Sequence, residues 1–250
     1  MKNLCLIFCF LPFLCLGQKE GRIIYTETIQ LGDIELPPEM AAYKDMFPSS
    51  KSTEMSLAFT ASEGIYQTHE VAAKEKESAS IEEDHVQIEI KTEQNESVIF
   101  TDLKNKEHVK SQEIFGKKFL IENPLKVLPW KMLNEQKEIL GYNCMKAVCT
   151  LDSNKTVVAW FTPQIPVSIG PATYQGLPGA ILALSVGEDK ITIAAKTIEM
   201  QKGIAGKLER PTKGKKVTQA AFDQLQEEKI KEMQEMYGGK GNVIIQMDRN

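Results

Sequence analysis

The stretch 155–184, KTVVAWFTPQIPVSIGPATYQGLPGAILAL, decides the fold of this chain. It begins as a strand over 156–162, continues as a loop interrupted by four prolines, and ends in the apolar run 180–184. Because that run does not alternate between apolar and polar residues, we expect both of its faces to be covered. The stretch has no nucleophile–base pair and no metal-ligand spacing. We therefore interpret it as an apolar element that provides shape and contacts, not as a reactive site.

The turn within this stretch has a sequence signature of its own. In Leu177-Pro178-Gly179-Ala180, proline followed by glycine predicts a type II turn with Gly179 at positive φ. Gly176 is expected to allow a close approach of the backbone. A loop as long as 162–179 is usually functional or packed on itself. It therefore either plugs the end of the core or forms a lip that binds a ligand or partner. The candidate lip residues are Trp160, Phe161, Tyr174, Gly176, Leu177, Pro178, Gly179 and Ile181.

The neighbouring segments predict strand partners on both sides. Residues 144–151 and 156–162 flank the turn 152–155 and should form a hairpin. In its simplest register Ala147 faces Trp160 and Cys149 faces Val158, which would bury the indole against a small residue. Residues 191–200 should complete a second hairpin with the apolar run 180–184.

The octapeptide YQGLPGAI at 174–181 resembles the signature of the GLPGLI family. The segments ILGYNCMKA at 139–147, AWFT at 159–162 and IPVSIGP at 165–171 match in the same order, so the resemblance covers roughly 130–184. It implies an exported protein of Gram-negative envelopes with no established activity, and it transfers no catalytic residue. Ala180 stands where the family name has leucine, which should loosen one apolar contact.

The N-terminus predicts export. Residues 1–17 combine a basic start at Lys2, an apolar run at 4–16 that is too short to span a bilayer, and a small residue at Gly17. We read them as a signal peptide cleaved after Gly17. Lipidation at Cys15 is the rival reading, but Leu14 precedes that cysteine where a small residue is usual. Residues 18–250 are then one exported domain, located in the periplasm, at the outer membrane or outside the cell.

Composition fits one globular domain that does not bind nucleic acid. The chain has 250 residues, 42% of them hydrophobic, and a net charge of −4. No stretch after residue 17 is long and apolar enough for a transmembrane helix. Cys144 and Cys149 lie in one predicted strand, where five steps of about 3.3 Å and an odd spacing point them to opposite faces. Two buried thiols are therefore expected rather than a disulfide.

The rest of the chain predicts a mainly β (α+β) fold: a curved antiparallel sheet or partly open barrel with a C-terminal helix packed on it. The helix is expected at 218–237, with Thr218 as its N-cap and an apolar stripe that begins at Phe222. A short helix at 39–47, an exposed acidic loop at 74–84 and an edge strand at 242–248 are also expected. The expected strands are 22–31, 53–60, 65–72, 86–91, 97–103, 108–114 and 117–121.

No motif nominates a reaction, a metal or a cofactor. The three histidines, His69, His85 and His108, lie in separate predicted segments, and no HExxH, CxxC, P-loop or dinucleotide pattern is present. We therefore expect a non-catalytic module that binds an apolar ligand or a membrane-protein partner. A secreted hydrolase-type enzyme whose residues converge only in the fold and a purely structural interaction module are the alternatives.

Overall fold

The computed structural model describes residues 19–31, 48–69, 78–83, 86–91, 97–114, 116–151 and 155–237. Within these, twelve strands form one sheet and two form a separate hairpin. The signal peptide at 1–17, the helix expected at 39–47 and the edge strand expected at 242–248 lie outside the described residues.

The large sheet is open, and its two edges are β14 and β9. Neighbouring strands are antiparallel throughout except for β14, which runs parallel to β8. In spatial order the strands are β14 (Lys215–Val217), β8 (Lys117–Pro124), β7 (Glu107–Ile114), β6 (Ser97–Asp102), β3 (Glu63–Thr68), β2 (Ser50–Phe59), β1 (Gly21–Gln30), β13 (Ile191–Met200), β12 (Ala180–Val186), β11 (Thr156–Thr162), β10 (Tyr142–Thr150) and β9 (Lys131–Ile139). The separate hairpin pairs β4 (Ser78–Glu83) with β5 (Val86–Lys91).

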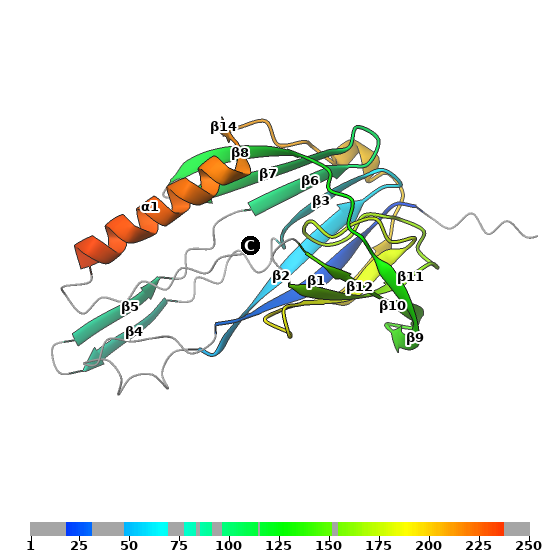
Figure 1. Cartoon of the computed structure of the whole chain (residues 1–250), viewed down its shortest axis with the longest axis horizontal. Coiled ribbons are helices and arrows are strands. Elements are labelled where there is room, and N and C mark those ends of the chain that lie inside the picture. The colour runs from blue at the N-terminus through cyan, green and yellow to red at the C-terminus, as the bar shows by residue number, and fades with distance from the viewer. Residues whose placement is uncertain are drawn as a thin grey trace, which may run out of the picture.

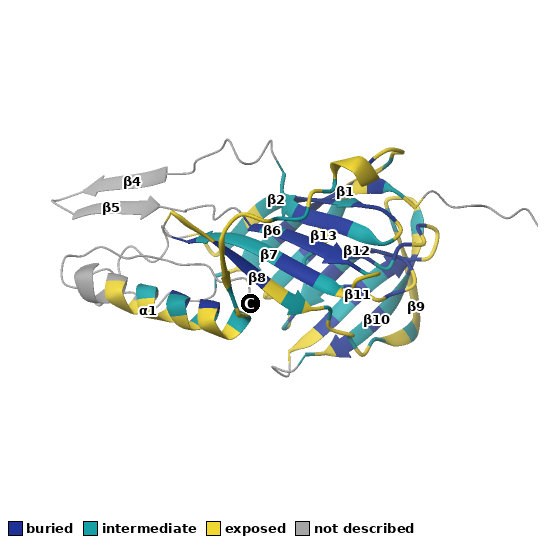
Figure 2. Cartoon of the chain, turned by 90° about the horizontal axis from the view of Figure 1, so that it is seen from above, coloured by how far each residue is buried: buried dark blue, intermediate teal, exposed yellow. Residues whose placement is uncertain are grey.

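The sheet curls, as Figure 1 shows, and the residue pairing identifies its two faces. Residues directly opposite one another on neighbouring strands point to the same side of a sheet. One such row runs across six strands through Ile23, Leu57, Tyr66, Ile99, Lys110 and Ile121. We call the side on which this row lies the inner face. Figure 2 shows how burial concentrates in the middle strands of the sheet.

Two apolar clusters lie on the inner face and a third lies on the outer face. The largest contains buried side chains of β1, β2, β3 and β10–β13 together with residues of the proline-rich loop 163–179. The second joins Phe119 and Ile121 of β8 to Phe222 of the helix α1 (Gln219–Tyr237). On the outer face Phe100, Val109 and other residues of β3 and β6–β8 pack against Leu208.

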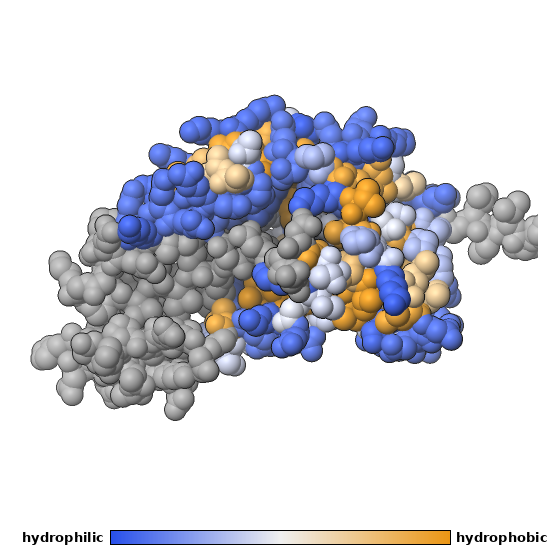
Figure 3. Space-filling model, in the orientation of Figure 1, coloured by the Kyte–Doolittle hydropathy of each residue, from blue (hydrophilic) through white to orange (hydrophobic). Residues whose placement is uncertain are grey.

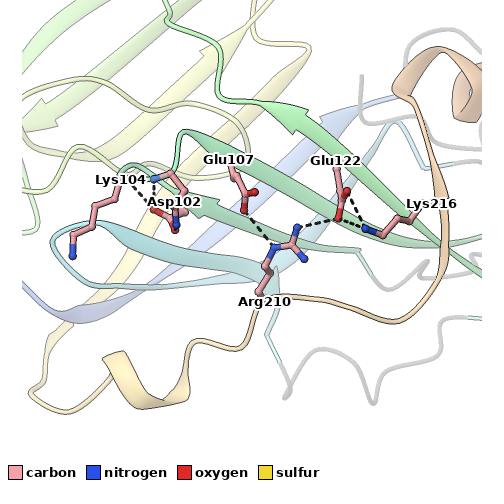
Figure 4. A network of polar contacts seen from close by, with 7 residues as sticks. Asp102, Lys104, Glu107, Glu122, Arg210 and Lys216 are labelled. Atoms are coloured by element: carbon pink, nitrogen blue, oxygen red, sulfur yellow. Dashed lines mark hydrogen bonds and ion pairs between the residues drawn. The ribbon is translucent and has the colours of Figure 1, made fainter.

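The C-terminal arm, residues 204–237, wraps around the β8 edge of the sheet. Leu208 packs on the outer face, and beside it the Arg210 guanidinium lies 3.5 Å from the Glu107 carboxylate and 2.9 Å from that of Glu122 (Figure 4). Three residues of β14 then pair with β8, and α1 packs on the inner face through Phe222. The Phe222 and Phe119 rings meet edge to face at 5.6 Å. The arm therefore covers one edge of the sheet on both faces.

The mainly β class, the curved sheet and the C-terminal helix are confirmed. The N-cap is also confirmed, because the Thr218 hydroxyl accepts a hydrogen bond from the Ala221 amide at 3.2 Å. The exposed loop expected at 74–84 is wrong over Ser78–Glu83, which forms β4. The mixed charges of this segment gave no strand pattern in the sequence, although its backbone pairs with β5. The edge strand β9 was not expected at all.

Candidate functional site

The loop 163–179 is a plug that fills part of the inner face. Its apolar side chains Ile165, Val167, Ile169 and Leu177 are each no more than 2% exposed. Backbone hydrogen bonds hold its shape, among them those from the Gly176 amide to Ser168 O at 2.8 Å and from the Ala180 amide to Ile165 O at 2.9 Å. Figure 3 shows apolar side chains reaching the surface near β10–β12, with polar ones around them. The plug interpretation of this loop therefore accounts for its buried half.

The two glycines of the YQGLPG motif exchange the roles expected from the sequence. Gly176 has φ +96°, a conformation that residues with a Cβ rarely adopt. Gly179 is not among the residues with positive φ, so the predicted type II turn is wrong. A Cβ at Gly179 would instead lie 2.1 Å from Thr162 O, which means that this glycine allows the start and the end of the plug to touch.

The structure divides the candidate lip residues into two sets. Phe161, Leu177 and Ile181 are 1–2% exposed and belong to the core, and Gly179 is buried with them. These residues cannot contact a partner unless the core opens. The members that reach the surface are Trp160, Tyr174, Gly176 and Pro178.

Trp160 lies on the outer face, because the hairpin register differs from the simplest one. Lys146 is opposite Trp160 and Val157 is opposite Cys149, so the predicted pairing is wrong by one residue. The Leu151 amide donates to Lys155 O at 3.0 Å, so Leu151 lies opposite Lys155 instead of Thr156, and one residue fewer than expected separates the paired positions. A shift of one residue moves every side chain to the other face.

Two lysine ammonium groups, one from β9 and one from β10, lie over the half-buried Trp160 ring. The Lys137 ammonium is 4.2 Å from the ring centroid and that of Lys146 is 5.8 Å away. Lys146 is also paired with Glu135 at 2.9 Å. The result is a cationic surface with an aromatic centre, and no such surface was expected from the sequence.

Cys144 and Cys149 are free and buried, as predicted. Cys149 lies opposite the buried Val157, whereas Cys144 shares the face of Lys146 and Trp160 by alternation along β10. Burial raises the pKa of both thiols. Two thiols on opposite faces of one strand cannot form a disulfide with each other.

The hairpin β9–β10 has an unusual tip. Leu140 and Gly141 connect the paired residues Ile139 and Tyr142, with φ +52° and +80°. Positive φ at both positions is the type I′ geometry, for which asparagine and glycine are preferred. Leu140 is nevertheless 48% exposed, and Met132 on the same edge strand is 56% exposed. We call Leu140 at the tip, together with Lys137, Lys146 and Trp160 on the outer face, the β9 surface, and Met132 lies on the inner side of the same strand.

A polar group lies inside the core beneath the plug. The Glu27 side chain is 3% exposed, and the Tyr66 hydroxyl donates to its carboxylate at 2.8 Å. Burial, with smaller contributions from Cys149 and Glu27, raises the pKa of Tyr174 to about 12. A buried carboxylate needs such hydrogen bonds to offset its lost hydration. Glu27 lies in the strand predicted at 22–31, on the same face as Ile23 and Tyr25 by alternation, but the sequence alone does not show that a carboxylate there is enclosed.

A second polar group on the inner face carries side-chain atoms without hydrogen-bond partners. These are Ser97 Oγ of β6 and, on β7, His108 Nε2 and Gln112 Oε1, with Ser97 directly opposite Gln112. Burial, and secondarily the charge of Lys110, lowers the pKa of His108 to about 4. His108 is therefore neutral in the folded protein at neutral pH.

Acidification should destabilise the protein through His108. The folded protein binds this proton only near pH 4, whereas the unfolded chain binds it near pH 6.5. The stability that His108 contributes is thus present above pH 6.5 and is lost as pH falls toward 4. The largest contribution of this pKa shift to the free energy of unfolding is about 3 kcal/mol, at 1.36 kcal/mol per pKa unit. Urea unfolding of wild type and His108→Gln at pH 7.5, 6 and 4.5 measures this effect. The difference in unfolding free energy between the two proteins should change with pH. A difference that stays the same at all three pH values would contradict the assignment.

The two described histidines, His69 and His108, lie apart. Within the described ranges no group of three or more His, Cys, Asp or Glu side chains could hold a metal ion. His69 lies 4.0 Å from Glu54, His108 lies in β7, and His85 is outside the described residues. None of the helices described is both long and apolar enough to cross a membrane.

Comparison with known proteins adds a family match over the plug. A family model described as a protein of unknown function (Porph_ging) matches residues 150–183. The matched residues include the GLPG motif, but the GLPGLI name is not confirmed. No curated protein matches the chain.

Two solved structures share the fold. The crystal structures of PNGF-II in space groups P21 and C2 match with TM-scores of 0.53 and 0.54 at 15% and 14% identity. Each match covers 82% of this chain and 32% of the other, so the chain spans about a third of the length of these proteins. At this identity the likeness concerns the fold alone.

Proposed function

We propose that this protein is an exported, non-catalytic module that binds a protein partner through the β9 surface. The plug supports a protein partner over a small apolar ligand, because the chain's own Ile165, Val167, Ile169 and Leu177 occupy the apolar inner face. What remains accessible is an aromatic and cationic surface on the opposite side of β9–β11. The matched structures support a module as well, since there the fold is part of a longer chain.

The observation that carries the proposal is Leu140. An exposed leucine at the tip of β9–β10 gains nothing from burial, and its φ of +52° is unfavourable for a residue with a Cβ. Asparagine would suit the turn better on both counts. Large exposed apolar side chains beside aromatic and cationic residues are typical of sites that partners cover.

Export is part of the same proposal and rests on the N-terminal sequence. Expression of the full chain and of a version that lacks residues 2–17, followed by cell fractionation, tests it. The full chain should leave the cytoplasm shortened by 17 residues, as measured by intact mass. An uncleaved cytoplasmic protein would contradict export without affecting the binding proposal.

Photo-crosslinking tests the binding proposal in the native envelope. A photoreactive amino acid at Leu140 or at Met132 should give an adduct of the same added mass, since both positions lie on β9 or its tip. The same amino acid at Lys202 and Lys213, which are exposed on other segments, is the matched control. No adduct at either β9 position, or equal adducts at all four, would contradict the proposal.

Replacing Leu140 should separate stability from binding. We expect Leu140→Asn to stabilise the folded protein by about 0.5–1 kcal/mol, because asparagine tolerates positive φ and an exposed leucine contributes little. The same variant should weaken the partner adduct formed from Met132. Thermal unfolding and crosslinking yield measure the two effects. A destabilised variant would show that Leu140 makes a packing contact of its own.

A further inference from the structure

We infer that the free edge of β9 pairs with an extended segment of the partner whose side chains are acidic on the face that meets the lysines of β9. This inference rests on the proposed function and specifies the chemistry of the partner. Its starting point is the difference between the two edges of the sheet. The C-terminal arm covers β8 through β14 and α1, whereas β9 has no strand beside it among the described residues.

The turn geometry shows which backbone groups of β9 are available. In a two-residue hairpin loop, the flanking pair Ile139 and Tyr142 exchanges backbone hydrogen bonds. The bonding alternates along the strand, so the amides and carbonyls of Glu138 and Gln136 point to the free edge. Glu138 and Gln136 lie opposite Asn143 and Met145, before the register shift further along the hairpin. This half of β9 can therefore accept another strand by the usual ladder of backbone bonds.

The side chains beside this edge select the sign of the partner's charge. Lys131 and Lys137 share the outer face with Lys146 and Trp160, since Lys131 lies opposite Val148 and Lys137 opposite Cys144. In the described part of the chain neither Lys131 nor Lys137 lies within ion-pair distance of a carboxylate, whereas Lys146 is paired with Glu135. Carboxylates on the added strand would meet these two ammonium groups.

The opposite face of the accepting half is polar. Gln136 and Glu138 lie opposite Met145 and Asn143 and point to the inner side, whereas Met132, which is 56% exposed, lies beyond the register shift opposite Ala147. Only the outer face therefore specifies the partner's side chains. Lysines along an edge strand hinder pairing with a second copy of the same edge. An acidic strand removes that repulsion, so the charge pattern favours a different protein over a homodimer.

Two synthetic peptides test the inference directly. Fluorescein-labelled Glu-Val-Glu-Val-Glu-Val-Glu and its lysine counterpart have the same alternation and opposite charge. Measured by anisotropy on the full chain, the acidic peptide should bind at least about tenfold more tightly than the basic one, and the difference should shrink at high salt. Equal affinities, or no binding of the acidic peptide, would overturn the inference.

Two substitutions locate the binding. Gln136→Pro removes an amide that points to the free edge and no bond within the hairpin, so it should reduce affinity at least about tenfold with little loss of fold. Glu138→Pro is the second variant if the first unfolds. Lys137→Glu should also weaken binding, whereas Lys213→Glu, the same charge change on the arm, should not. Unchanged affinity in Gln136→Pro and Glu138→Pro would overturn strand pairing.

Crosslinking from Leu140 in the Gln136→Pro variant separates the two claims. We expect the partner adduct to disappear when the edge is blocked. An adduct that persists would leave the proposed function intact and overturn pairing at β9. An adduct that is absent even in the wild type would contradict the proposed function itself.

Discussion

Gly179→Ala should destabilise the protein by at least about 3 kcal/mol. A Cβ at this position would lie 2.1 Å from Thr162 O, 2.5 Å from the carbonyl carbon of Thr162 and 2.8 Å from Pro163 N. All three are backbone atoms, so no side-chain rotation relieves the clash, and the plug must move away from β11. Such forced shifts in a packed core are among the most costly single substitutions. Urea unfolding by circular dichroism measures the loss.

Gly206→Ala is the matched control for this experiment. Its new Cβ would have no atom within 4 Å, and Gly206 is not among the glycines with positive φ. We expect a change near zero, or a slight stabilisation from the reduced freedom of the unfolded chain. If Gly179→Ala were as mild as Gly206→Ala, the plug would not touch β11 as described.

Phe161→Ala and Trp160→Ala should differ strongly although the two residues are neighbours. Phe161 is 1% exposed in the largest cluster, so its truncation should cost about 3–5 kcal/mol. Trp160 is half-buried on the outer face, where its contact with Lys137 is worth about 0.5–1 kcal/mol, and its truncation should cost about 1–2 kcal/mol. Denaturant unfolding of both variants gives the comparison.

The register predicted from the sequence alone would give a different result. With Ala147 opposite Trp160, the indole would be buried and would cost as much to remove as Phe161. A larger loss for Trp160→Ala than for Phe161→Ala would therefore support that register and contradict the observed pairing. In the observed register, Trp160→Ala should instead reduce the partner adduct formed from Leu140.

Strands with clear alternation or strong turn signals were predictable. Val86–Lys91, Thr156–Thr162 and Ile191–Met200 form strands with the bounds expected, because each is rich in β-branched residues and ends at polar or turn residues. The helix from Gln219 to Tyr237 follows equally from its cap and its apolar stripe. In these segments the local preference and the tertiary environment agree.

The β9 surface could not be found because it depends on pairing between strands. Lys131–Ile139 reads as mixed polar and charged, and only its place at the end of the sheet makes it an edge strand. One residue fewer between the paired positions after Leu151 decides whether Trp160 points inward or outward. Short-range chemistry does not fix whether Leu151 pairs with Lys155 or with Thr156.

The buried polar residues could not be predicted from the sequence for a related reason. Glu27 and His108 occupy positions that alternation assigns to the inner face, where an apolar residue is the usual choice. Glu27 is bonded to Tyr66, which lies on a strand far from it in the chain, and His108 Nε2 has no hydrogen-bond partner among the described residues. Only the assembled sheet shows which polar side chains are enclosed.

Hydrogen–deuterium exchange across residues 131–184 tests most directly whether the proline-rich loop is a packed plug while β9 stays open. The amides of Gly176 and Ala180, which bond to Ser168 O and Ile165 O, should be protected about as strongly as the strand β12. The amides of Gln136 and Glu138 should exchange rapidly. Rapid exchange throughout 163–179 together with protection at Gln136 and Glu138 would mean that the loop is an open lip and that the edge is already covered, which contradicts the account.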